Sequence, residues 1–528
     1  MRYDYDWLVI GSGFGGSVSA LRLAQKGYKV GVLECGRRFK DDELPKSTWD
    51  VRRYWYAPKL GLNGIFRLTI FKDVAIASGS GVGGGSLGYA NTLYRAPDRF
   101  YEDPQWAGLN DWQVALAPHY EEAERMLGVA TYDEDDPADD YLREYAEEIG
   151  VAETHAKTRV GVFLGEPGKT VKDPFFGGAG PDRTGCVRCG RCMVGCPHGA
   201  KNTLVKNYLW FAEREGAKVM PERTAVDIEP LGATDGADGY AVTTERSGAW
   251  VRRGRQTITA RGVVVAAGAL GTNRLLATCR LNGSLPRLSP RLGELVRTNS
   301  EAILAVTLPH GSPDVIRRVA ITGSIYPDPN THIETVVYGD AGGAMSGLFT
   351  MLTGDGTPLT RPLKLAGAAA RHPRTLAKTL NPRGWSNRTI IVLVMQSLDN
   401  AISLRARRGR NGRVRLSTEQ DPERPNPTFI SVANAFAEWL AERTGGFAQS
   451  SIMEAAANIP STAHILGGAV IGADPEHGVI DADQRVFGYR NLLVCDGAAN
   501  PANVGVNPSL TITALAEHAM SHIEARVG

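Results

Sequence analysis

The stretch Trp7-Leu-Val-Ile-Gly11-Ser-Gly-Phe-Gly-Gly16 joins a continuous apolar run to a glycine-rich turn and the start of a helical pattern. The apolar run predicts a parallel strand buried on both faces, and the spacing of residues 14–26 predicts a helix. A second strand over 28–34 ends at Glu34, 23 residues after Gly11. This pattern indicates a dinucleotide site, because glycines let a pyrophosphate approach the helix N-terminus and the acid accepts a ribose hydroxyl. The residues expected at this site are Gly11, Gly13, Phe14, Gly15, Gly16 and Glu34. The alternative to a dinucleotide site is a glycine turn in an ordinary α/β unit.

The composition is that of a globular protein. The chain has 528 residues, of which 43% are hydrophobic and 22% charged, which argues against a disordered chain and against a membrane protein. Lys and Arg number 59 against 57 Asp and Glu, a balance that gives no support to nucleic-acid binding. The N-terminus lacks the stages of a signal peptide, and the longest apolar stretches, such as 263–269, are shorter than the roughly 20 residues of a membrane span. We therefore expect a cytoplasmic protein with no transmembrane segment. A peripheral contact with a membrane is compatible with this expectation.

Three further glycine-rich turns follow strand-like runs. The cluster 78–86 with Asn91 behind it, the strand-to-helix turn at 263–276, and the late segment 494–497 each offer backbone N–H groups to a ligand. Four such elements spread over the chain suit an extended FAD better than an NAD held in one compact domain. The candidate cofactor-binding residues in these turns are Gly79, Gly81, Gly83, Gly84, Gly85, Ser86, Asn91, Asp496 and Gly497.

The strand patterns predict two kinds of sheet. Residues 217–267 resemble a meander that returns into a parallel sheet, whereas residues 300–430 alternate with a period of two, as at 333–337 and 390–394. Before both regions, within residues 96–185, we expect a helix near 117–127 and an acidic loop near 133–140. The expected fold class is α/β (α+β overall), with a Rossmann-like FAD-binding domain and a discontinuous antiparallel-sheet substrate domain. The expected ranges are 1–45, 72–95, 200–300 and 460–528 for the FAD-binding domain, and 96–199 with 301–459 for the substrate or cap domain.

Taken together, these segments resemble the glucose–methanol–choline (GMC) family of flavoprotein oxidoreductases, and within it the cholesterol oxidase branch. The matching stretches are 11–16 with Glu34, 79–91, the turn in 263–276, and 494–515, and they span the chain nearly end to end. The resemblance implies FAD as the cofactor and hydride transfer from an alcohol to flavin. It also implies a small-molecule substrate that is a bulky apolar alcohol, a sterol or 3-hydroxysteroid-like molecule, oxidised at a secondary hydroxyl to a ketone.

The family pattern implies a catalytic pair in two glycine-rich loops. Its histidine matches His464 in the segment 462–468, and its asparagine matches Asn507 in Gly-Val-Asn-Pro, residues 505–508. His464 is expected to take the alcohol proton, because the imidazole pKa of about 6.5 lies near working pH. Asn507 is expected to hold the substrate oxygen and the flavin edge, because an amide both donates and accepts hydrogen bonds.

Glu334 is a third candidate, in the strand-like segment 331–337. Its position is similar to that of the carboxylate with which cholesterol oxidases isomerise a steroid double bond. A buried carboxylate there would have a raised pKa and could move a proton between ring carbons. The same alternation fits a surface strand with Glu334 facing solvent, so the isomerisation step stays open. His332 would share the face of Glu334 in a structural role.

Four of the seven cysteines, Cys186, Cys189, Cys192 and Cys196, form a C-x₂-C-x₂-C-x₃-C-P run like that of bacterial ferredoxins. In two-cluster ferredoxins the fourth cysteine of this run ligates the other cluster, and no second run exists in this sequence. The run can therefore hold a [4Fe–4S] cluster with all four thiolates or a [3Fe–4S] cluster with three. A structural zinc ion and four unligated thiols are the alternatives. The well-studied cholesterol oxidases do not need such a cluster, so its presence would favour a carrier protein or a quinone over oxygen as electron acceptor.

Three functional interpretations remain. The leading one is an FAD-dependent alcohol oxidoreductase of the GMC type with His464 as base. The second is an FAD and iron–sulfur dehydrogenase of a sugar, a long-chain alcohol or another hydroxylated metabolite. The third is a non-catalytic flavin and iron–sulfur redox sensor, against which the presence of both His464 and Asn507 weighs. Six arginines between 405 and 415 flank Asn411-Gly412 and favour a solvated hairpin over a docking surface for an acidic carrier or an anionic membrane.

Overall fold

A mixed sheet surrounds the strand that precedes the first glycine turn. The structure is a computed structural model that describes residues 2–409, 412 and 414–526. The strand order in this sheet is β12-β2-β1-β15-β14-β13, and β27 also pairs with β15. The bounds are β1 Tyr5–Ile10, β2 Val30–Leu33, β12 Lys218–Met220, β13 Arg223–Pro230, β14 Tyr240–Arg246, β15 Gln256–Val265 and β27 Leu492–Val494. The strands β1, β2, β12, β15 and β27 pair in parallel, and β13 to β15 form the expected meander, so the Rossmann-like prediction is confirmed.

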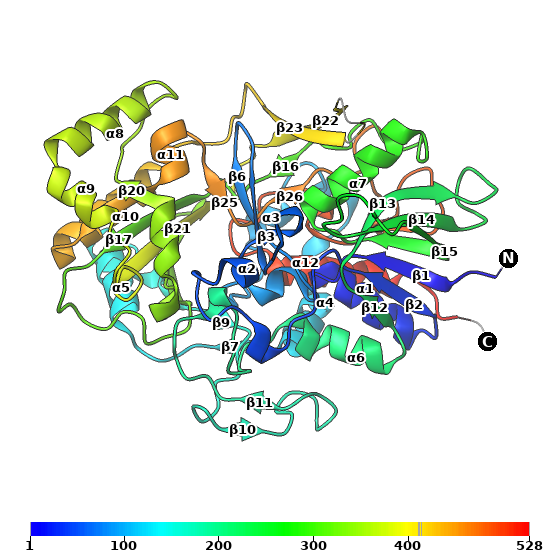
Figure 1. Ribbon diagram of the computed structural model, residues 1–528, viewed down its shortest axis with the longest axis horizontal. Coiled ribbons are helices and arrows are strands. Elements are labelled where there is room, and N and C mark those ends of the chain that lie inside the picture. The colour runs from blue at the N-terminus through cyan, green and yellow to red at the C-terminus, as the bar shows by residue number, and fades with distance from the viewer. Residues whose placement is uncertain (1, 410–411, 413, 527–528) are drawn as a thin grey trace.

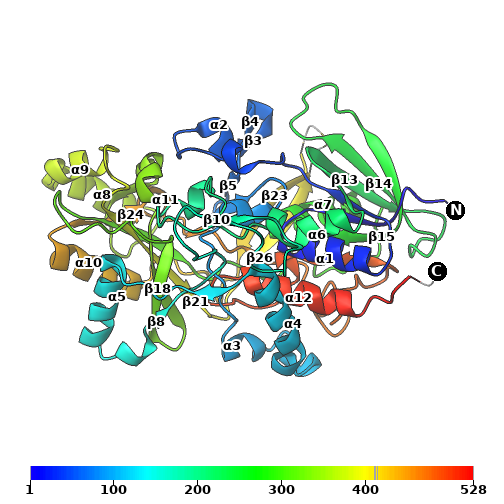
Figure 2. The ribbon, with the colours of Figure 1, turned by 90° about the horizontal axis from the view of Figure 1, so that it is seen from below.

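Helices from distant parts of the chain cover this sheet. The helix α1 (Phe14–Gln25) packs against α6 (Tyr208–Arg214) and α12 (Ser509–Ser521), and α12 packs against α4 (Trp112–Leu127). Their apolar side chains form one core with the strands, in which Val18, Leu209 and Leu515 are buried. Figures 1 and 2 show this lobe at one end of the long axis, with both chain termini beside it. The N-terminal turn is therefore held by elements from the middle and the end of the chain.

A second, antiparallel sheet forms the other lobe, in the order β20-β24-β17-β21-β19-β18-β8. Its bounds are β8 Ala156–Lys157, β17 Ala302–Thr307, β18 Ile321–Asp328, β19 Thr331–Val336, β20 Phe349–Met351, β21 Thr389–Gln396 and β24 Phe447–Ser451. The helices α5 (Pro137–Glu148) and α10 (Ser431–Thr444) pack on one face, and Phe39 and Val194 lie in the core on the other. Because both faces are covered, β19 is buried throughout, and the solvent-facing interpretation of Glu334 is wrong.

The remaining helices and strands lie on or between the two lobes (Figure 1). The remaining helices are α2 Val51–Tyr54, α3 Asp98–Tyr101, α7 Ala269–Asn282, α8 Thr360–Arg371, α9 Pro373–Thr379 and α11 Ile452–Ala457. The remaining strands are β3 Tyr56–Ala57, β4 Leu62–Asn63, β5 Phe66–Ile70, β6 Ala75–Gly79, β7 Ala130–Thr131, β9 Arg159–Val160, β10 Thr170–Val171, β11 Arg183–Thr184, β16 Val296–Arg297, β22 Ile402–Arg408, β23 Val414–Gln420, β25 Ser461–Thr462 and β26 Leu466–Gly467. The exact domain boundaries stay a prediction, although each lobe draws on several separated segments as expected.

The expected acidic loop near 133–140 is in part the start of α5. Asp136 caps that helix, because its carboxylate accepts hydrogen bonds from the backbone N–H groups of Ala138 and Asp139. The Asp136 side chain also pairs with the buried Arg318, and that of Asp139 with Lys157. Asp136 and Asp139, two of the acidic residues of the expected loop, are thus buried with partners from other parts of the chain. The expected helix near 117–127 exists as α4 and begins five residues earlier.

The hairpin expected in the arginine-rich segment forms between β22 and β23, which contain Arg405, Arg407, Arg408 and Arg415. Arg405 pairs with Glu419 across the hairpin, and Arg408 donates to the carbonyl oxygen of Leu281. Its turn at Asn411-Gly412 lies in part outside the described residues. Within the described part of the chain, none of the helices has the length and apolar character to cross a bilayer.

Candidate active site

The turn after β1 places the N-terminus of α1 beside an open space. No side chain caps the helix at Gly13, and an added Cβ there would meet no protein atom within 4 Å. Gly15 differs, because a Cβ there would lie 1.9 Å from the carbonyl oxygen of Cys495. The turn therefore docks α1 against the C-terminal part of the chain at Gly15 and leaves room for an anion at Gly13. The other predicted residues of this turn are Gly11 and Gly16, which pack against backbone, and Phe14, which is buried.

Glu34 follows β2, and its buried carboxylate lies at the same turn. Its Oε2 accepts hydrogen bonds from the backbone N–H of Ser12 at 3.1 Å and from the Ser12 hydroxyl at 2.7 Å. Its Oε1 accepts one from the N–H of Gly36 at 2.8 Å. The Ser12 hydroxyl oxygen in turn accepts a hydrogen bond from the N–H of Gly83 at 3.1 Å. These contacts hold the acid beside both glycine segments, and its contact with a ribose hydroxyl stays a prediction.

The second glycine segment, residues 79–91, lies against the first. A Cβ on Gly84 would lie 2.6 Å from Cα of Gly13, and the Ser86 hydroxyl donates to the carbonyl of Gly83 at 2.7 Å. Asn91 is fully buried, yet neither its amide nitrogen nor its amide oxygen has a hydrogen-bond partner. Asn500 is also fully buried with both amide atoms unpartnered. Leaving a buried amide unsatisfied costs about 1–3 kcal/mol. Such atoms mark a place for the polar groups of a ligand. The neighbouring candidates Gly79, Gly81 and Gly85 lie in the same segment.

Asp496 uses its carboxylate to join two segments of the protein. Its Oδ2 accepts hydrogen bonds from the N–H of Gly268 at 2.8 Å and from the Thr272 hydroxyl at 2.5 Å, and its Oδ1 accepts one from the N–H of Ala498 at 2.7 Å. Burial raises the pKa of this carboxyl to about 6. Asp496 therefore fixes the start of α7 against the segment that contains Gly497. A direct contact of these two residues with a cofactor stays a prediction.

His464 lies in the loop between β25 and β26, with Glu301 beside it. The Nδ1 atom of His464 contacts Oε1 of Glu301, and Oε2 of Glu301 accepts a hydrogen bond from the N–H of Ala463 at 2.8 Å. Because an ionised carboxylate can only accept, the proton of the neutral ring belongs on Nδ1 and the lone pair on Nε2. Burial disfavours the charged imidazole, but Glu301 and then Glu334 outweigh it and raise the pKa of His464.

Glu334 and Asn507 complete this cluster. The Asn507 amide nitrogen donates to Oε2 of Glu334 at 3.4 Å, while Oε1 of Glu334 and the Asn507 amide oxygen are buried and unpartnered. The pKa of Glu334 is raised to about 8: burial is the largest cause, His464 and Asn507 oppose it, and Glu301 adds to it. The structure thus brings together all three predicted catalytic residues and leaves two of their polar atoms free for a ligand.

His332 is also buried on β19, two residues before Glu334. Its ring lies 4.6 Å from that of Tyr326 and 5.3 Å from that of Tyr94, measured between centroids, and both of its nitrogens lack partners. Burial lowers the pKa of His332 to about 3, so the ring is neutral in the folded protein at neutral pH. This aromatic packing agrees with the expected structural role.

Sequence reasoning missed Glu301. This residue is fully buried immediately before β17, and its partner His464 lies 163 residues later in the chain. An acidic residue in front of an apolar strand is common, so no local pattern separates it from a surface residue. Only the contact between the two residues in the folded chain shows that Glu301 orients the histidine.

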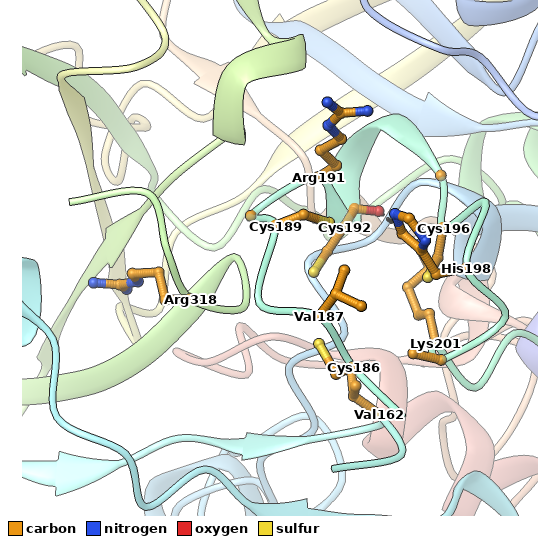
Figure 3. Close-up of a pocket in the computed structure, with 13 residues that line it drawn as sticks. Val162, Cys186, Val187, Cys189, Arg191, Cys192, Cys196, His198, Lys201 and Arg318 are labelled. Atoms are coloured by element: carbon orange, nitrogen blue, oxygen red, sulfur yellow. Dashed lines mark hydrogen bonds between the residues drawn. The ribbon is translucent and has the colours of Figure 1, made fainter. Parts of the chain in front are cut away.

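The four cysteines of the ferredoxin-like run surround one pocket (Figure 3). The cavity volume of this pocket is about 20 Å³, and its lining also contains His198, Lys201 and Arg318. None of the four cysteines forms a disulfide. Within the described residues, no three Cys, His, Asp or Glu side chains converge closely enough to hold a single metal ion.

Comparisons with known proteins agree with this architecture. Two family models, both described as GMC oxidoreductase, match residues 179–292 and 430–516. Over 99% of its length the chain is 52% identical to a cholesterol oxidase of Mycobacterium tuberculosis, of which it covers 91%. It is 46% identical to a cholesterol oxidase of Acinetobacter baumannii, with 99% of this chain and 95% of that protein aligned. The solved structure of pyridoxine 4-oxidase from Mesorbium loti matches with a TM-score of 0.61 over 99% of this chain and 100% of the other; at 14% identity this likeness concerns the fold alone.

Proposed function

Because this chain belongs to the GMC oxidoreductase family, we propose that it is an FAD-dependent enzyme that oxidises the secondary hydroxyl of a sterol or 3-hydroxysteroid-like alcohol to a ketone. The observation that carries this proposal is the buried cluster of His464, Glu301, Asn507 and Glu334 between the two lobes. Its relatives named cholesterol oxidase, aligned over nearly their whole length, support a sterol as the substrate class.

The residues present fit FAD. The open space at Gly13 suits a pyrophosphate at the N-terminus of α1, and the Glu34 carboxylate lies where it can accept a ribose hydroxyl. The unsatisfied amides of Asn91 and Asn500 would find partners on the polar groups of the cofactor. When bound, FAD supplies the acceptor for the hydride of the carbinol carbon.

His464 is the base in this proposal. Its Nε2 accepts the proton of the substrate hydroxyl, because Glu301 engages Nδ1 and fixes both the ring orientation and the tautomer. As the alcohol loses this proton and a hydride, its C–O single bond becomes the carbonyl of the ketone. The free amide oxygen of Asn507 lies in the same buried cluster and can accept from the substrate before the proton moves.

The decisive test uses His464→Ala and Asn507→Ala. Each should lower the rate at which a sterol bleaches the flavin under anaerobic single-turnover conditions by at least about 10²-fold. His477→Ala is the matched control, because that histidine is exposed and pairs only with Asp474. Full-rate bleaching in either site variant would contradict the assignment, and a flavin-containing protein that no alcohol reduces would favour the sensor.

Glu334 supports a second step, the isomerisation of a steroid double bond. A carboxyl whose pKa is raised to about 8, mainly by burial, is basic enough once ionised to take a proton from one ring carbon and return it to another. Glu334→Gln should therefore lower the ratio of isomerisation to oxidation at least about 10-fold. The absorbance of the conjugated enone, recorded beside ketone formation, measures this ratio, and an unchanged ratio would remove Glu334 from the step.

The second cofactor of this proposal is an iron–sulfur cluster, [4Fe–4S] or [3Fe–4S], held by the four cysteines. The support is that Cys186, Cys189, Cys192 and Cys196 line a single pocket. A cluster would give the enzyme a carrier protein or a quinone as electron acceptor besides dioxygen. Iron and acid-labile sulfide per flavin, measured on anaerobically purified protein, test for it.

We also propose that α8 and α9 dock the enzyme on an anionic lipid surface, where a sterol is found. Leu359, Leu363 and Leu380 are 80%, 70% and 67% exposed, and residues 357–389 contain no Asp or Glu. The exposed cations of this segment are Lys364, Arg371, Arg374, Lys378 and Arg383. Exposed leucines beside unopposed basic residues suit the headgroup region of an anionic membrane. Figure 1 shows the two helices at the edge of the molecule far from the chain termini.

A further inference from the structure

The cysteine pocket adjoins the glycine segment that faces the dinucleotide turn. The link is Lys201, whose Nζ donates to the carbonyl oxygens of Leu87 at 2.9 Å, Tyr89 at 3.2 Å and Cys192 at 2.8 Å. Leu87 ends the turn that contains Ser86, and Cys192 is a member of the cysteine run. One side chain thus connects the proposed cluster site to the proposed flavin site.

An aromatic side chain bridges the same two sites. The ring of Tyr89 meets the ring of Phe14 edge to face, with centroids 5.6 Å apart, and Phe14 belongs to the first glycine turn. On its other side Tyr89 is close to the cysteines: burial and then the neighbouring Cys192 raise the pKa of its phenol. Lys201 Nζ also lies 5.0 Å from the centre of the Tyr89 ring. A short, packed path therefore runs from Phe14 through Tyr89 to Cys192.

The charge of Lys201 indicates what the pocket holds. The residue is 1% exposed and lines the pocket, and no carboxylate of the described residues lies within ion-pair distance of its Nζ. The other buried cation of the lining, Arg318, already pairs with Asp136. A buried ammonium is costly unless an anion lies near it. A cluster ligated by four thiolates carries a net negative charge and supplies that anion.

The loop geometry suits four ligands around one object. Gly190 and Gly195 both have positive φ, and a Cβ on Gly190 would lie 2.7 Å from the carbonyl oxygen of Ile316. The loop is therefore held tightly against the antiparallel-sheet lobe. On the other side of the pocket, Pro197 and His198 are exposed directly after Cys196, so an external acceptor can approach there.

We propose that all four cysteines ligate one [4Fe–4S] cluster and that this cluster relays electrons from reduced flavin to an external one-electron carrier, with Lys201 as its buried counter-charge. The relay rests on the proposed alcohol oxidation. Each alcohol oxidised leaves two electrons on the flavin. The cluster is reduced by one electron and reoxidised by one carrier molecule, twice per turnover, and the protons are released to water. The step therefore consumes two equivalents of oxidised carrier for each ketone formed.

The first test measures composition. Anaerobically purified protein should contain about four iron and four sulfide per flavin, and Cys279→Ser should retain them, because Cys279 is buried against β13 and does not line the pocket. Cys192→Ser should lose the four-iron cluster and its absorption. Zinc without sulfide, no metal at all, or three iron in protein never exposed to air would overturn the four-thiolate assignment. If sterol still bleaches the flavin of an iron-free protein, the proposed oxidation stands and only the cluster fails.

The second test measures the relay. After single-turnover reduction by sterol, ferricytochrome c should reoxidise the flavin of the parent and of Cys279→Ser at least about 10-fold faster than that of Cys192→Ser. Equal rates would contradict the relay. If Cys192→Ser does not fold, parent protein stripped of iron and then reconstituted with iron and sulfide gives the same comparison.

The role of Lys201 has its own readout. Lys201→Met should shift the reduction potential of the cluster downward, because the positive charge favours the reduced, more negative state. Lys206→Met is the matched control, since Lys206 pairs with Asp41 and does not line the pocket. A potential that moves equally in both variants, or in neither, would remove Lys201 from this role.

Discussion

The Glu301 side chain determines the pH at which His464 can act. Burial opposes protonation of the imidazole, but Glu301 and Glu334 raise its pKa above the ordinary value. Below that raised pKa the ring carries a proton on Nε2 and cannot take one from the alcohol, so flavin reduction should accelerate as pH rises through it. Glu301→Gln removes the negative charge and keeps an amide oxygen that can still accept from Nδ1, so it should move this acidic limb to lower pH while lowering the plateau by about 10–10²-fold.

The pH profile of single-turnover flavin reduction measures both effects. Glu476→Gln is the control, because Glu476 is exposed and contacts only its own turn. A lower plateau with an unmoved acidic limb would mean that Glu301 only supports the loop. An unchanged profile would exclude any influence of Glu301 on His464.

Glu334 makes folding stability depend on pH. Its pKa is raised to about 8, first by burial, whereas an unfolded glutamate titrates near 4.5. Between these two pH values the folded state keeps a proton that the unfolded state releases, so stability falls as pH rises through this window. Glu334→Gln cannot ionise, and it should gain stability relative to the parent by up to a few kcal/mol between pH 5 and pH 8. Thermal melts at closely spaced pH values test this, and a constant difference in Tm would refute it.

At the scale of elements, the two glycines of the first turn are expected to fail in different ways when substituted. Gly13→Ala adds a methyl group to open space, so the protein without flavin should keep its Tm, while the affinity for FAD should fall at least about 10-fold. Gly15→Ala forces α1 away from Cys495, so the flavin-free protein itself should lose about 1–3 kcal/mol or more. Melting curves with and without FAD separate the two. If both variants melt like the parent and bind FAD normally, α1 does not carry the cofactor site.

The same elements show what local sequence can and cannot predict. The turn at Gly11, the helix after it and the acid at Glu34 were predictable, because phosphate binding at a helix N-terminus imposes a fixed order on a short segment. The start of α5 was misread, because Asp139 is buried by Lys157, a partner whose approach no local pattern encodes. The exposure of β19 was not readable either, since a strand alternates in the same way whether one or both of its faces are covered.

At the scale of the whole molecule, the candidate site belongs to neither lobe alone. Glu334 comes from the antiparallel sheet, His464 from the connection between the lobes, and Asn507 from the loop before α12. The family resemblance could name these three residues in advance. It could not supply Glu301 or the path from Phe14 through Tyr89 to the cysteine pocket, because both arise only when segments more than 70 residues apart pack together.

The last prediction concerns how the whole molecule meets its substrate. Burying Leu359 and Leu363 in a lipid headgroup region contributes about 1.5–3 kcal/mol for each side chain. Leu359→Asp combined with Leu363→Asp should therefore weaken co-sedimentation with vesicles of anionic phospholipid and cholesterol at least about 10-fold, and should slow oxidation of vesicle cholesterol more than that of detergent-solubilised cholesterol. Val114→Asp is the control, because Val114 is 68% exposed on α4, outside the α8–α9 segment. Binding of the parent should also weaken as salt is raised, since the exposed cations of this segment are unopposed. If the double leucine variant binds vesicles as tightly as Val114→Asp does, another surface meets the lipid, because the loss of the two exposed leucines would then leave the affinity for vesicles unchanged.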